Sequence, residues 1–354
     1  MRRAIVTTAA VVALLPAAQG ALGQAPPAHP ASMTGWGAVT TAGEALRAGP
    51  DTTAPASGTV ASTRVAGRAQ SLSRDAAGAV WVHLAFPDAV TGWAPGAAIR
   101  AVPAPAALSA GTLRILTRAN ASLGPRAALV VRDGWGRTLF AAGTRRPLML
   151  ASVTKLATVS AALSADPSLP AGSVAAILRP SDNARAQALS NVLGSGSRTL
   201  GARRAADHAA ALGAAWHVVD GSGLSRGNRA AAGEVADLLL GVRDEPGFRT
   251  LFRGLPVAGR TGTLAWRMRG TGAAGRVRAK TGTYDDWRTS SLAGYFWPAG
   301  SGLSPERAYV VVSLENGVSP YRARPVQDVI AAALTARGAL TPAGPSPVGI
   351  TSVR

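Results

Sequence analysis

The sequence predicts an α+β domain, an antiparallel sheet with a helical subdomain, preceded by a small all-β domain. Two observations carry this prediction. Short strand-like runs separated by turn residues fill residues 34–102, and Ala79–Leu84 alternates with the period of a half-buried strand. After the Pro/Ala-rich linker 103–112, strand-like runs stand on both sides of a block of helix-like runs. One sheet whose two halves close around a helical insertion explains that order.

The expected elements follow in chain order. Strands of the small domain are expected at Ala38–Thr41, Gly58–Thr63, Ala79–Ala85 and Thr91–Ala94. The larger domain, 113–337, is expected to begin with strands Leu113–Leu116, Ala127–Val131 and Arg137–Ala142, the last two joined by a hairpin at Asp133-Gly134. Expected helices are Ser152–Leu163, Ser173–Leu178, Ala184–Leu193, Arg203–Leu212 and Ala230–Val242. Strands Gly275–Lys280, Ser290–Trp297 and Ala308–Leu314 follow, then a helix from Pro325 to about Ala336. The tail 338–354 is expected to be flexible.

The composition limits the classes of function. A net charge of +19 indicates anionic surroundings such as cell-wall polymers. Arginine is scattered along the chain and aromatic residues are only 5%, which argues against a dedicated nucleic-acid reader. The absence of cysteine excludes disulfides and thiolate metal sites, and the four histidines show no metal-ligand spacing. No metal or cofactor is therefore expected.

The N-terminus is typical of an export signal. Arg2 and Arg3 precede the apolar run Ala4–Leu15, and small residues suited to cleavage follow at Ala21–Ala25. The apolar run is too short to cross a bilayer, which takes about 20 residues. We expect residues 1–25 to be removed and the mature protein to reside in the periplasm or the extracellular envelope, without a transmembrane anchor.

One stretch combines a nucleophile with a possible base. The Ser152 hydroxyl and the Lys155 amine lie three residues apart, so on a helix they share a face. Of the 37 Lys and Arg residues, only Lys155 and Lys280 are lysine. Because lysine, unlike arginine, loses its proton readily when buried, these two positions are candidates for chemistry that needs an amine.

Both lysines fall inside an ordered set of three motifs: Ser152-Val153-Thr154-Lys155, Ser181-Asp182-Asn183 and Lys280-Thr281-Gly282-Thr283. S-x-x-K, S-D-N and K-T-G in that order are the signature of penicillin-binding proteins and serine β-lactamases. Acyl transfer then needs Ser152 as nucleophile and Lys155 as proton acceptor, its pKa lowered by burial and by a cation at Lys280.

The remaining motif residues are expected to handle the substrate. Ser181 can relay a proton to the leaving amine, and Asn183 can hold a substrate peptide group. Thr281, Gly282 and Thr283 form the substrate-binding segment, with the two hydroxyls binding a carboxylate. Backbone N–H groups of Ser152 and Thr283 are candidates for the oxyanion hole. Asp182 is equally explained as a helix N-cap or as a catalytic group.

Two further strings imitate known motifs in the wrong context. Arg260-Thr261-Gly262-Thr263 has arginine in place of the motif lysine, and no clear strand leads into it. Gly270–Gly275 fits G-x-G-x-x-G but precedes a strand, whereas a dinucleotide site opens a helix after one. Both are expected to be structural.

Longer strings carry a narrower resemblance. Asp220-Gly221-Ser222-Gly223-Leu224-Ser225-Arg226 and Gly275–Thr283 resemble the corresponding segments of the class C low-molecular-mass penicillin-binding proteins. This resemblance implies a D-alanyl-D-alanine carboxypeptidase or endopeptidase with the penicillin-binding-protein/serine β-lactamase-like transpeptidase fold. It would act on peptidoglycan stem peptides through a Ser152 acyl-enzyme and be inhibited by β-lactams.

The chain also departs from that family. Only 25 residues, Leu156–Pro180, separate the first two motifs, where the family carries large inserted domains. Asp285 and Asp286 follow the third motif and should weaken carboxylate binding unless Arg288 pairs with one of them.

Strings in the small domain carry a resemblance of their own. Leu46-Arg47-Ala48-Gly49-Pro50 and Gly92-Trp93-Ala94-Pro95 resemble the signatures of bacterial SH3-like domains, which implies a wall-peptide-binding barrel or a spacer.

Two other functions remain open from the sequence. A serine β-lactamase would need a glutamate-bound water for deacylation, and the candidates Glu234 and Glu245 lie outside the usual motif. A non-catalytic wall-binding protein would rely on the SH3-like domain, but it would have no reason to keep lysine at Lys155 and Lys280 alone.

Overall fold

The computed structural model describes residues 35–40, 44–60, 66–86, 91–102, 106–286, 288–304 and 307–341. The chain forms two compact units, Met1–Pro105 with Ala343–Arg354, and Ala106–Pro342. The expected signal peptide and most of the expected flexible tail lie outside the described residues. No helix within the described ranges is long and apolar enough to cross a membrane.

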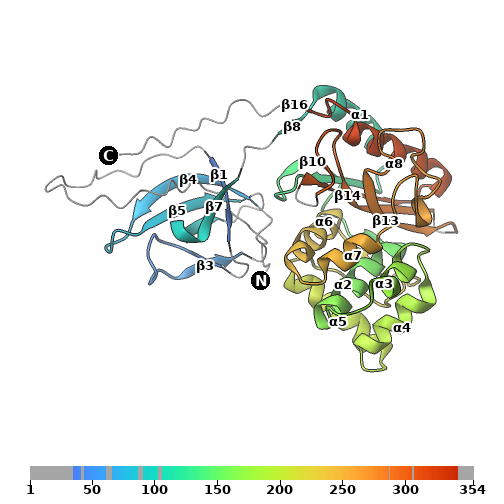
Figure 1. The fold of residues 1–354 in the computed structure, drawn as a ribbon, viewed down its shortest axis with the longest axis horizontal. Coiled ribbons are helices and arrows are strands. Elements are labelled where there is room, and N and C mark those ends of the chain that lie inside the picture. The colour runs from blue at the N-terminus through green and yellow to red at the C-terminus, as the bar shows by residue number, and fades with distance from the viewer. Residues whose placement is uncertain are drawn as a thin grey trace. The chain divides into compact units, whose positions relative to one another are not determined.

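The first unit contains one antiparallel sheet (Figure 1). Its strands, in the order in which they pair, are β3 (Ala56–Thr59), β2 (Ala45–Arg47), β6 (Thr91–Pro95), β5 (Val80–Ala85), β4 (Gly67–Arg74), β1 (Gly35–Val39) and β7 (Ile99–Val102). A short helix, η1 (Gly96–Ala98), joins β6 to β7. Buried Leu46, Val82, Leu84 and Ala94 form its core, as the alternation in β5 predicted. The prediction omitted β2, β4 and β7, whose polar and small residues give no clear apolar period.

The second unit is built around a five-stranded antiparallel sheet. Its strands, in order of pairing, are β10 (Thr138–Ala142), β9 (Ala127–Arg132), β15 (Tyr309–Asn316), β14 (Thr289–Phe296) and β13 (Val277–Tyr284). Strand β9 pairs with β15 from Arg132↔Val310 to Ala127↔Glu315. The N-terminal hairpin and the three C-terminal strands thus form one sheet, which confirms the predicted closure around a helical insertion.

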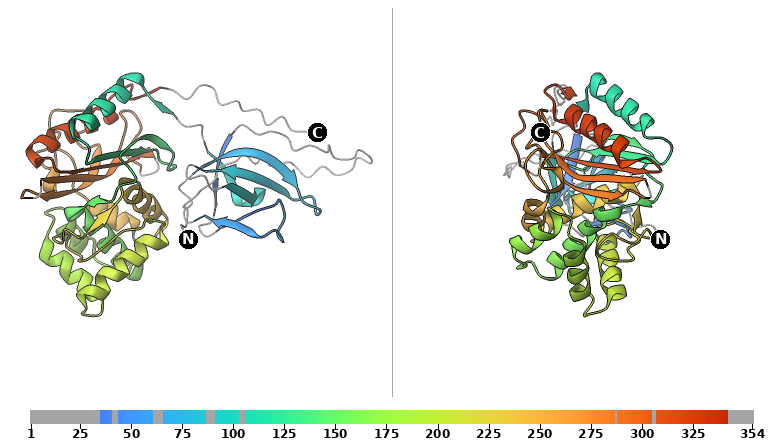
Figure 2. Two further views of the ribbon diagram at one scale, coloured as in Figure 1. Left: turned by 180° about the vertical axis from the view of Figure 1, so that it is seen from behind. Right: turned by 90° about the vertical axis from the view of Figure 1, so that its right-hand side faces the viewer.

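Helices cover both faces of this sheet. On one face lie α1 (Ala110–Ser122) and α8 (Pro320–Thr335), whose Leu116, Ile330 and Leu334 pack against Leu129, Val311 and Leu292 (Figures 1 and 2). On the other face lie α6 (Ala232–Gly241) and a group of helices that we call the helical subdomain. The helical subdomain comprises η2 (Ala151–Thr154), α2 (Lys155–Ala165), α3 (Ala171–Leu178), α4 (Asn183–Leu193), α5 (Arg198–Ala211), η3 (Val242–Asp244), α7 (Phe248–Gly254) and η4 (Gly262–Leu264). Every residue of β14 and β15 is buried, as expected for central strands covered on both faces.

Two short strand pairs complete the unit. Strand β11 (Leu148–Met149) pairs with β12 (Arg229–Ala230), just before the nucleophile motif. Strand β8 (Ala107–Leu108) pairs with β16 (Leu340–Thr341). Residues predicted as the end of the linker and the start of the flexible tail are therefore paired in the structure.

The predicted strand Leu113–Leu116 is wrong, because these residues lie inside α1. The Ser109 side chain accepts a hydrogen bond from the Thr112 N–H and caps the helix. Within the run only Leu116 is fully buried, while Leu113 and Ile115 are exposed. Four residues, three of them apolar, do not distinguish a strand from one turn of helix.

The predicted start of the last helix is also wrong. Helix α8 begins at Pro320, one turn before the predicted start, and Pro325 lies in its interior. Proline lacks an N–H, so the Tyr321 carbonyl loses its helical donor. Tyr321 and Pro325 are both exposed, so that carbonyl can bind water instead.

Candidate active site

Ser152 and Lys155 lie side by side at the junction of η2 and α2, as their spacing predicted. The Lys155 Nζ donates a hydrogen bond to Ser152 Oγ at 2.9 Å and to Asn183 Oδ1 at 2.7 Å. It also donates to the backbone oxygen of Ser222. The amine of the first motif thus contacts the second motif directly.

The Lys155 side chain is fully buried, which suits a proton acceptor. Burial is the largest influence on its pKa and lowers it to about 8, against the opposing charges of Asp220 and Asp182. A lysine in water has a pKa near 10.4, so folding moves this amine toward the range in which a neutral base is available.

The second lysine is buried as well. The Lys280 Nζ donates to the Thr281 carbonyl at 2.8 Å, and burial together with the nearby Lys155 amine holds the pKa of Lys280 well below its usual range. As expected, burial lowers the pKa of Lys155, whereas the expected contribution of Lys280 is not among the causes of the shift.

Two glycines let the chain pass close to the nucleophile. A Cβ at Gly282 would lie 2.4 Å from the Leu150 oxygen and 3.2 Å from the Ser152 nitrogen. A Cβ at Gly223, whose φ is +86°, would lie 2.3 Å from the Ala151 oxygen. Ala151 itself has a φ of +48°, and strain of this kind persists only where the surrounding structure imposes it.

The substrate-binding segment lies on β13, the edge strand next to Ser152. The Ala279 N–H points away from β14, toward the Pro256 oxygen. Since N–H groups alternate along a strand, those of Thr281 and Thr283 point to the same free edge. The Thr283 N–H is therefore aimed outward as an oxyanion donor requires.

The two threonine hydroxyls have partners that the sequence did not reveal. Arg324 on α8 donates from Nη2 to Thr283 Oγ1 at 3.2 Å. The Thr281 hydroxyl bonds that of Thr263 at 2.7 Å. The string Arg260–Thr263, predicted to be purely structural, thus adjoins the third motif.

The second motif lies where the helical subdomain faces β13. Ser181 has a φ of +63°, and Asp182 caps α4 by accepting from the Arg185 N–H at 2.9 Å. The N-cap explanation of Asp182 is thereby confirmed. Asn183, the first residue of α4, turns its oxygen to Lys155.

The Asp220–Arg226 loop holds Lys155 in place. The fully buried Asp220 carboxylate accepts from the Ser222 N–H and Oγ–H, both at 2.8 Å, and from the N–H groups of Gly223 and Ser225. These bonds turn the Ser222 carbonyl toward Lys155. The resemblance pointed to this loop, but its role in orienting the amine emerges only in three dimensions.

The acidic residues after the third motif are arranged differently from the expectation. Asp286 forms an ion pair with Arg226 at 3.7 Å, and not with Arg288. Tyr284 donates its hydroxyl to the carbonyls of Gly223 and Ser225, which ties β13 to the Asp220–Arg226 loop. Arg226 therefore offsets one of the two carboxylates.

Residues 172–337 match the sequence family described as D-Ala-D-Ala carboxypeptidase 3 (S13). The second and third motifs and the Asp220–Arg226 loop fall inside the matched residues 172–337, and the Ser152–Lys155 motif precedes them.

The chain matches less than half of the length of its D-alanyl-D-alanine carboxypeptidase and penicillin binding protein 4 relatives. The chain is 46% identical over 120 residues to the D-alanyl-D-alanine carboxypeptidase of Actinomadura sp. (strain R39), covering 32% of this chain and 21% of that protein. Penicillin binding protein 4 from Haemophilus influenzae shares 24% identity with a TM-score of 0.39, over 45% of this chain and 39% of that one. A β-lactamase from Chitinophaga pinensis shares 16% identity with a TM-score of 0.49, over 65% and 97%.

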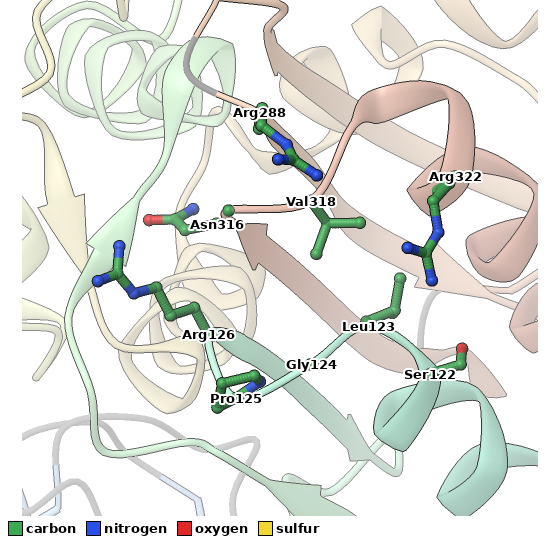
Figure 3. A pocket seen from close by; sticks show the side chains of 10 residues that line it. Ser122, Leu123, Gly124, Pro125, Arg126, Arg288, Asn316, Val318 and Arg322 are labelled. Atoms are coloured by element: carbon green, nitrogen blue, oxygen red, sulfur yellow. The ribbon is translucent and has the colours of Figure 1, made fainter.

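A hollow of about 430 Å³ is lined by residues 122–126, Arg288, residues 316–318 and Arg322 (Figure 3). Arg288 and Arg322 extend over its apolar floor of Leu123 and Val318. Asn316 at its rim accepts from the Met149 N–H at 2.8 Å and so fixes β11, three residues before Ser152. Ser152 does not line this hollow, so we assign the chemistry to the surface between β13 and the helical subdomain.

His208, Glu234 and Glu245 each have a structural partner. Buried His208 lies 3.6 Å from Glu245, and burial lowers the pKa of His208 to about 4. Glu234 accepts from the Ala231 N–H at 2.7 Å at the start of α6. Among the described residues, no group of three His, Asp or Glu side chains could hold a metal ion.

The lowered pKa of Lys155 predicts a pH dependence for acylation. The base must be neutral, so the second-order rate constant for penicillin acylation should rise about tenfold per pH unit below pH 8 and level off above it. Stopped-flow acylation between pH 5.5 and 10 measures this. A profile that is flat across pH 7 to 9 would contradict the assignment of Lys155 as base.

Proposed function

We propose that the protein is a serine-type D-alanyl-D-alanine carboxypeptidase/endopeptidase that cleaves peptidoglycan stem peptides through an acyl-enzyme on Ser152 and is inhibited by β-lactams. The observation that carries this proposal is the buried Lys155 amine, 2.9 Å from Ser152 Oγ and in contact with the S-D-N motif. The match of residues 172–337 to the S13 family supports it.

Acylation begins with the Lys155–Ser152 pair. Neutral Lys155 accepts the hydroxyl proton as Ser152 Oγ attacks the carbonyl carbon of the penultimate D-alanine. The negative charge that develops on the carbonyl oxygen is held by the N–H groups of Ser152 and Thr283. Losing one such donor typically costs about 10²–10³ in rate, so the close packing of Gly282 on Ser152 matters as much as the reacting side chains.

Departure of the leaving group involves the other motif residues. Ser181 relays the proton from Lys155 to the amine as the peptide bond breaks. Thr281, Thr283 and Arg324 bind the terminal carboxylate, and Asn183 holds a peptide group of the acyl part. Water then attacks the ester carbonyl while Lys155 accepts its proton; the bond from the acyl carbon to Ser152 Oγ breaks, and Lys155 returns the proton to Ser152 Oγ. No step of this scheme requires a cofactor.

The glutamates favour the peptidase over a β-lactamase. Glu234 is engaged with the α6 N-terminus, and Glu245 accepts from Ser164 and faces His208. Neither has a partner in the three motifs among the described residues, so neither is placed to activate a deacylating water.

The small domain and the N-terminus fit the same activity. We infer that the first unit is an SH3-like domain that binds wall peptides or acts as a spacer, and that the N-terminal segment directs export to the cell envelope. The net charge of +19 supports contact with anionic wall polymers.

Intact mass after incubation with benzylpenicillin tests the proposed function, together with penicillin consumption and D-Ala release from a diacetyl-Lys-D-Ala-D-Ala peptide. We expect a stable adduct on the tryptic peptide that ends at Lys155, and release of D-Ala. Penicillin consumption without an adduct would indicate a β-lactamase instead. Neither an adduct nor D-Ala release would indicate a non-catalytic wall-binding protein.

A further inference from the structure

Four arginines gather beside the candidate active site on four separate segments. Arg278 lies on β13, Arg179 follows α3, Arg253 lies near the end of α7, and Arg260 lies in the loop after α7. The Arg179 Nη2 donates to the Arg253 carbonyl at 3.1 Å, and Val257 bridges to Arg278, which brings the α7 segment against β13. We call these four residues the arginine cluster.

Within the described residues, the arginine cluster is not paired with a carboxylate. None of its members forms an ion pair with a carboxylate within the described part of the chain. Arg278 is half-buried, with its guanidinium 5.0 Å from the centre of the Phe252 ring. Burial and the charges of the other three lower the pKa of Arg278, which reflects the cost of crowding like charges. A bound anion would offset that cost.

The cluster lies on the side of the site that handles the leaving group. Arg179 is two residues before Ser181, the proposed proton relay to the leaving amine, and Arg278 is two residues before Lys280. The Arg179 carbonyl accepts from the Thr263 N–H at 3.0 Å, and the Thr263 hydroxyl bonds that of Thr281. Thr263 therefore connects Thr281, in the proposed terminal-carboxylate site, to Arg179 of the arginine cluster.

We propose that Arg179, Arg253, Arg260 and Arg278 form a subsite for a second carboxylate on the leaving part of the substrate. This proposal rests on the proposed function and specifies its substrate class: peptides whose leaving group is larger and more acidic than D-alanine. A cross-linked stem peptide has such a leaving group, so the subsite favours endopeptidase activity. Guanidinium groups suit this task because they stay charged when half-buried and bind carboxylates in a bidentate manner.

A pair of matched substrates tests the subsite. The acyl part is diacetyl-Lys-D-Ala in both, and the leaving residue is D-Glu in one and its neutral isostere D-Gln in the other. We expect kcat/KM to be about tenfold higher for D-Glu at low salt, and this ratio to shrink as salt screens the charges. The D-Glu/D-Gln ratio should fall toward one in Arg260→Gln and in Arg179→Gln. The exposed Arg203 on α5 provides the matched control, and Arg203→Gln should keep the ratio.

Because the readout is a ratio within one enzyme, partial loss of folded protein does not alter it. Acylation by benzylpenicillin, measured on the same samples, reports the proposed function separately. A penicillin adduct with equal kcat/KM for D-Glu and D-Gln would overturn the subsite and leave the peptidase standing. A ratio that persists in both cluster variants would also overturn it. Absence of both adduct and peptide turnover would remove the proposed function and the subsite with it.

Discussion

A Lys155→Arg enzyme is expected to acylate with penicillin at least about 10³-fold more slowly than the native protein, at the upper part of the range for a lost general base. Arginine keeps a cation beside Ser152 but cannot give up its proton at any working pH. The Lys155 pKa of about 8 is the property that arginine cannot reproduce. Stopped-flow acylation at pH 8 measures the loss, with Ser152→Ala as the zero reference.

The fully buried site calls for a second variant, because the larger guanidinium can disturb the packing. Lys155→Met keeps the volume and removes the amine, and it should show a loss of the same order. Far-UV circular dichroism and the thermal midpoint identify samples that remain folded. A folded Lys155→Arg enzyme that acylates within tenfold of the native rate would show that another group is the base.

A Gly282→Ala enzyme is expected to lose about 10²-fold or more in kcat/KM, since a misplacement of about 1 Å can have that effect on a catalytic site. The added methyl would sit 2.4 Å from the Leu150 oxygen, so β13 and the backbone before Ser152 must separate. Overpacking of this kind also costs about 1–3 kcal/mol of the free energy of unfolding.

The matched control is Gly172→Ala. Gly172 lies near the start of α3, and a Cβ there would meet nothing within 4 Å. Alanine has the higher helix propensity, so this variant should keep full activity and gain slightly in stability. Steady-state peptide hydrolysis and urea unfolding compare the two. A Gly282→Ala enzyme with native kcat/KM would show that the close approach of β13 is not needed.

The catalytic motifs could be predicted because their geometry is local. Ser152 and Lys155 are three residues apart on one helical turn, so their contact follows from the spacing alone. Arg324 could not be predicted, since it reaches Thr283 only because α8 packs across the sheet beside β13. Nothing in the sequence around Arg324 distinguishes it from the other arginines of the chain.

In the fold, too, local features could be predicted and features set by tertiary packing could not. Strand β9, a run of buried apolar residues, and the hairpin at Asp133 were predicted correctly, because burial and turn chemistry both appear in the local sequence. The helix over Leu113–Leu116 was missed because its apolar residues face two directions, and only packing against the sheet selects Leu116. Where a short run of residues fits both the helical and the strand period, tertiary contacts decide which secondary structure forms.

The pairing of β9 with β15 has a consequence for how the enzyme becomes active. These neighbours are separated by most of the domain's length, so the sheet cannot close until the C-terminal strands are present. Strand β13, which packs against Ser152 through Gly282, is held by that sheet. Until the C-terminal strands dock, Lys280 and the Thr283 N–H are missing from the site, and Ser152 and Lys155 lack that oxyanion donor. We therefore expect a nascent or half-folded chain to be inactive toward its substrate, and the enzyme to become active only when the sheet is complete.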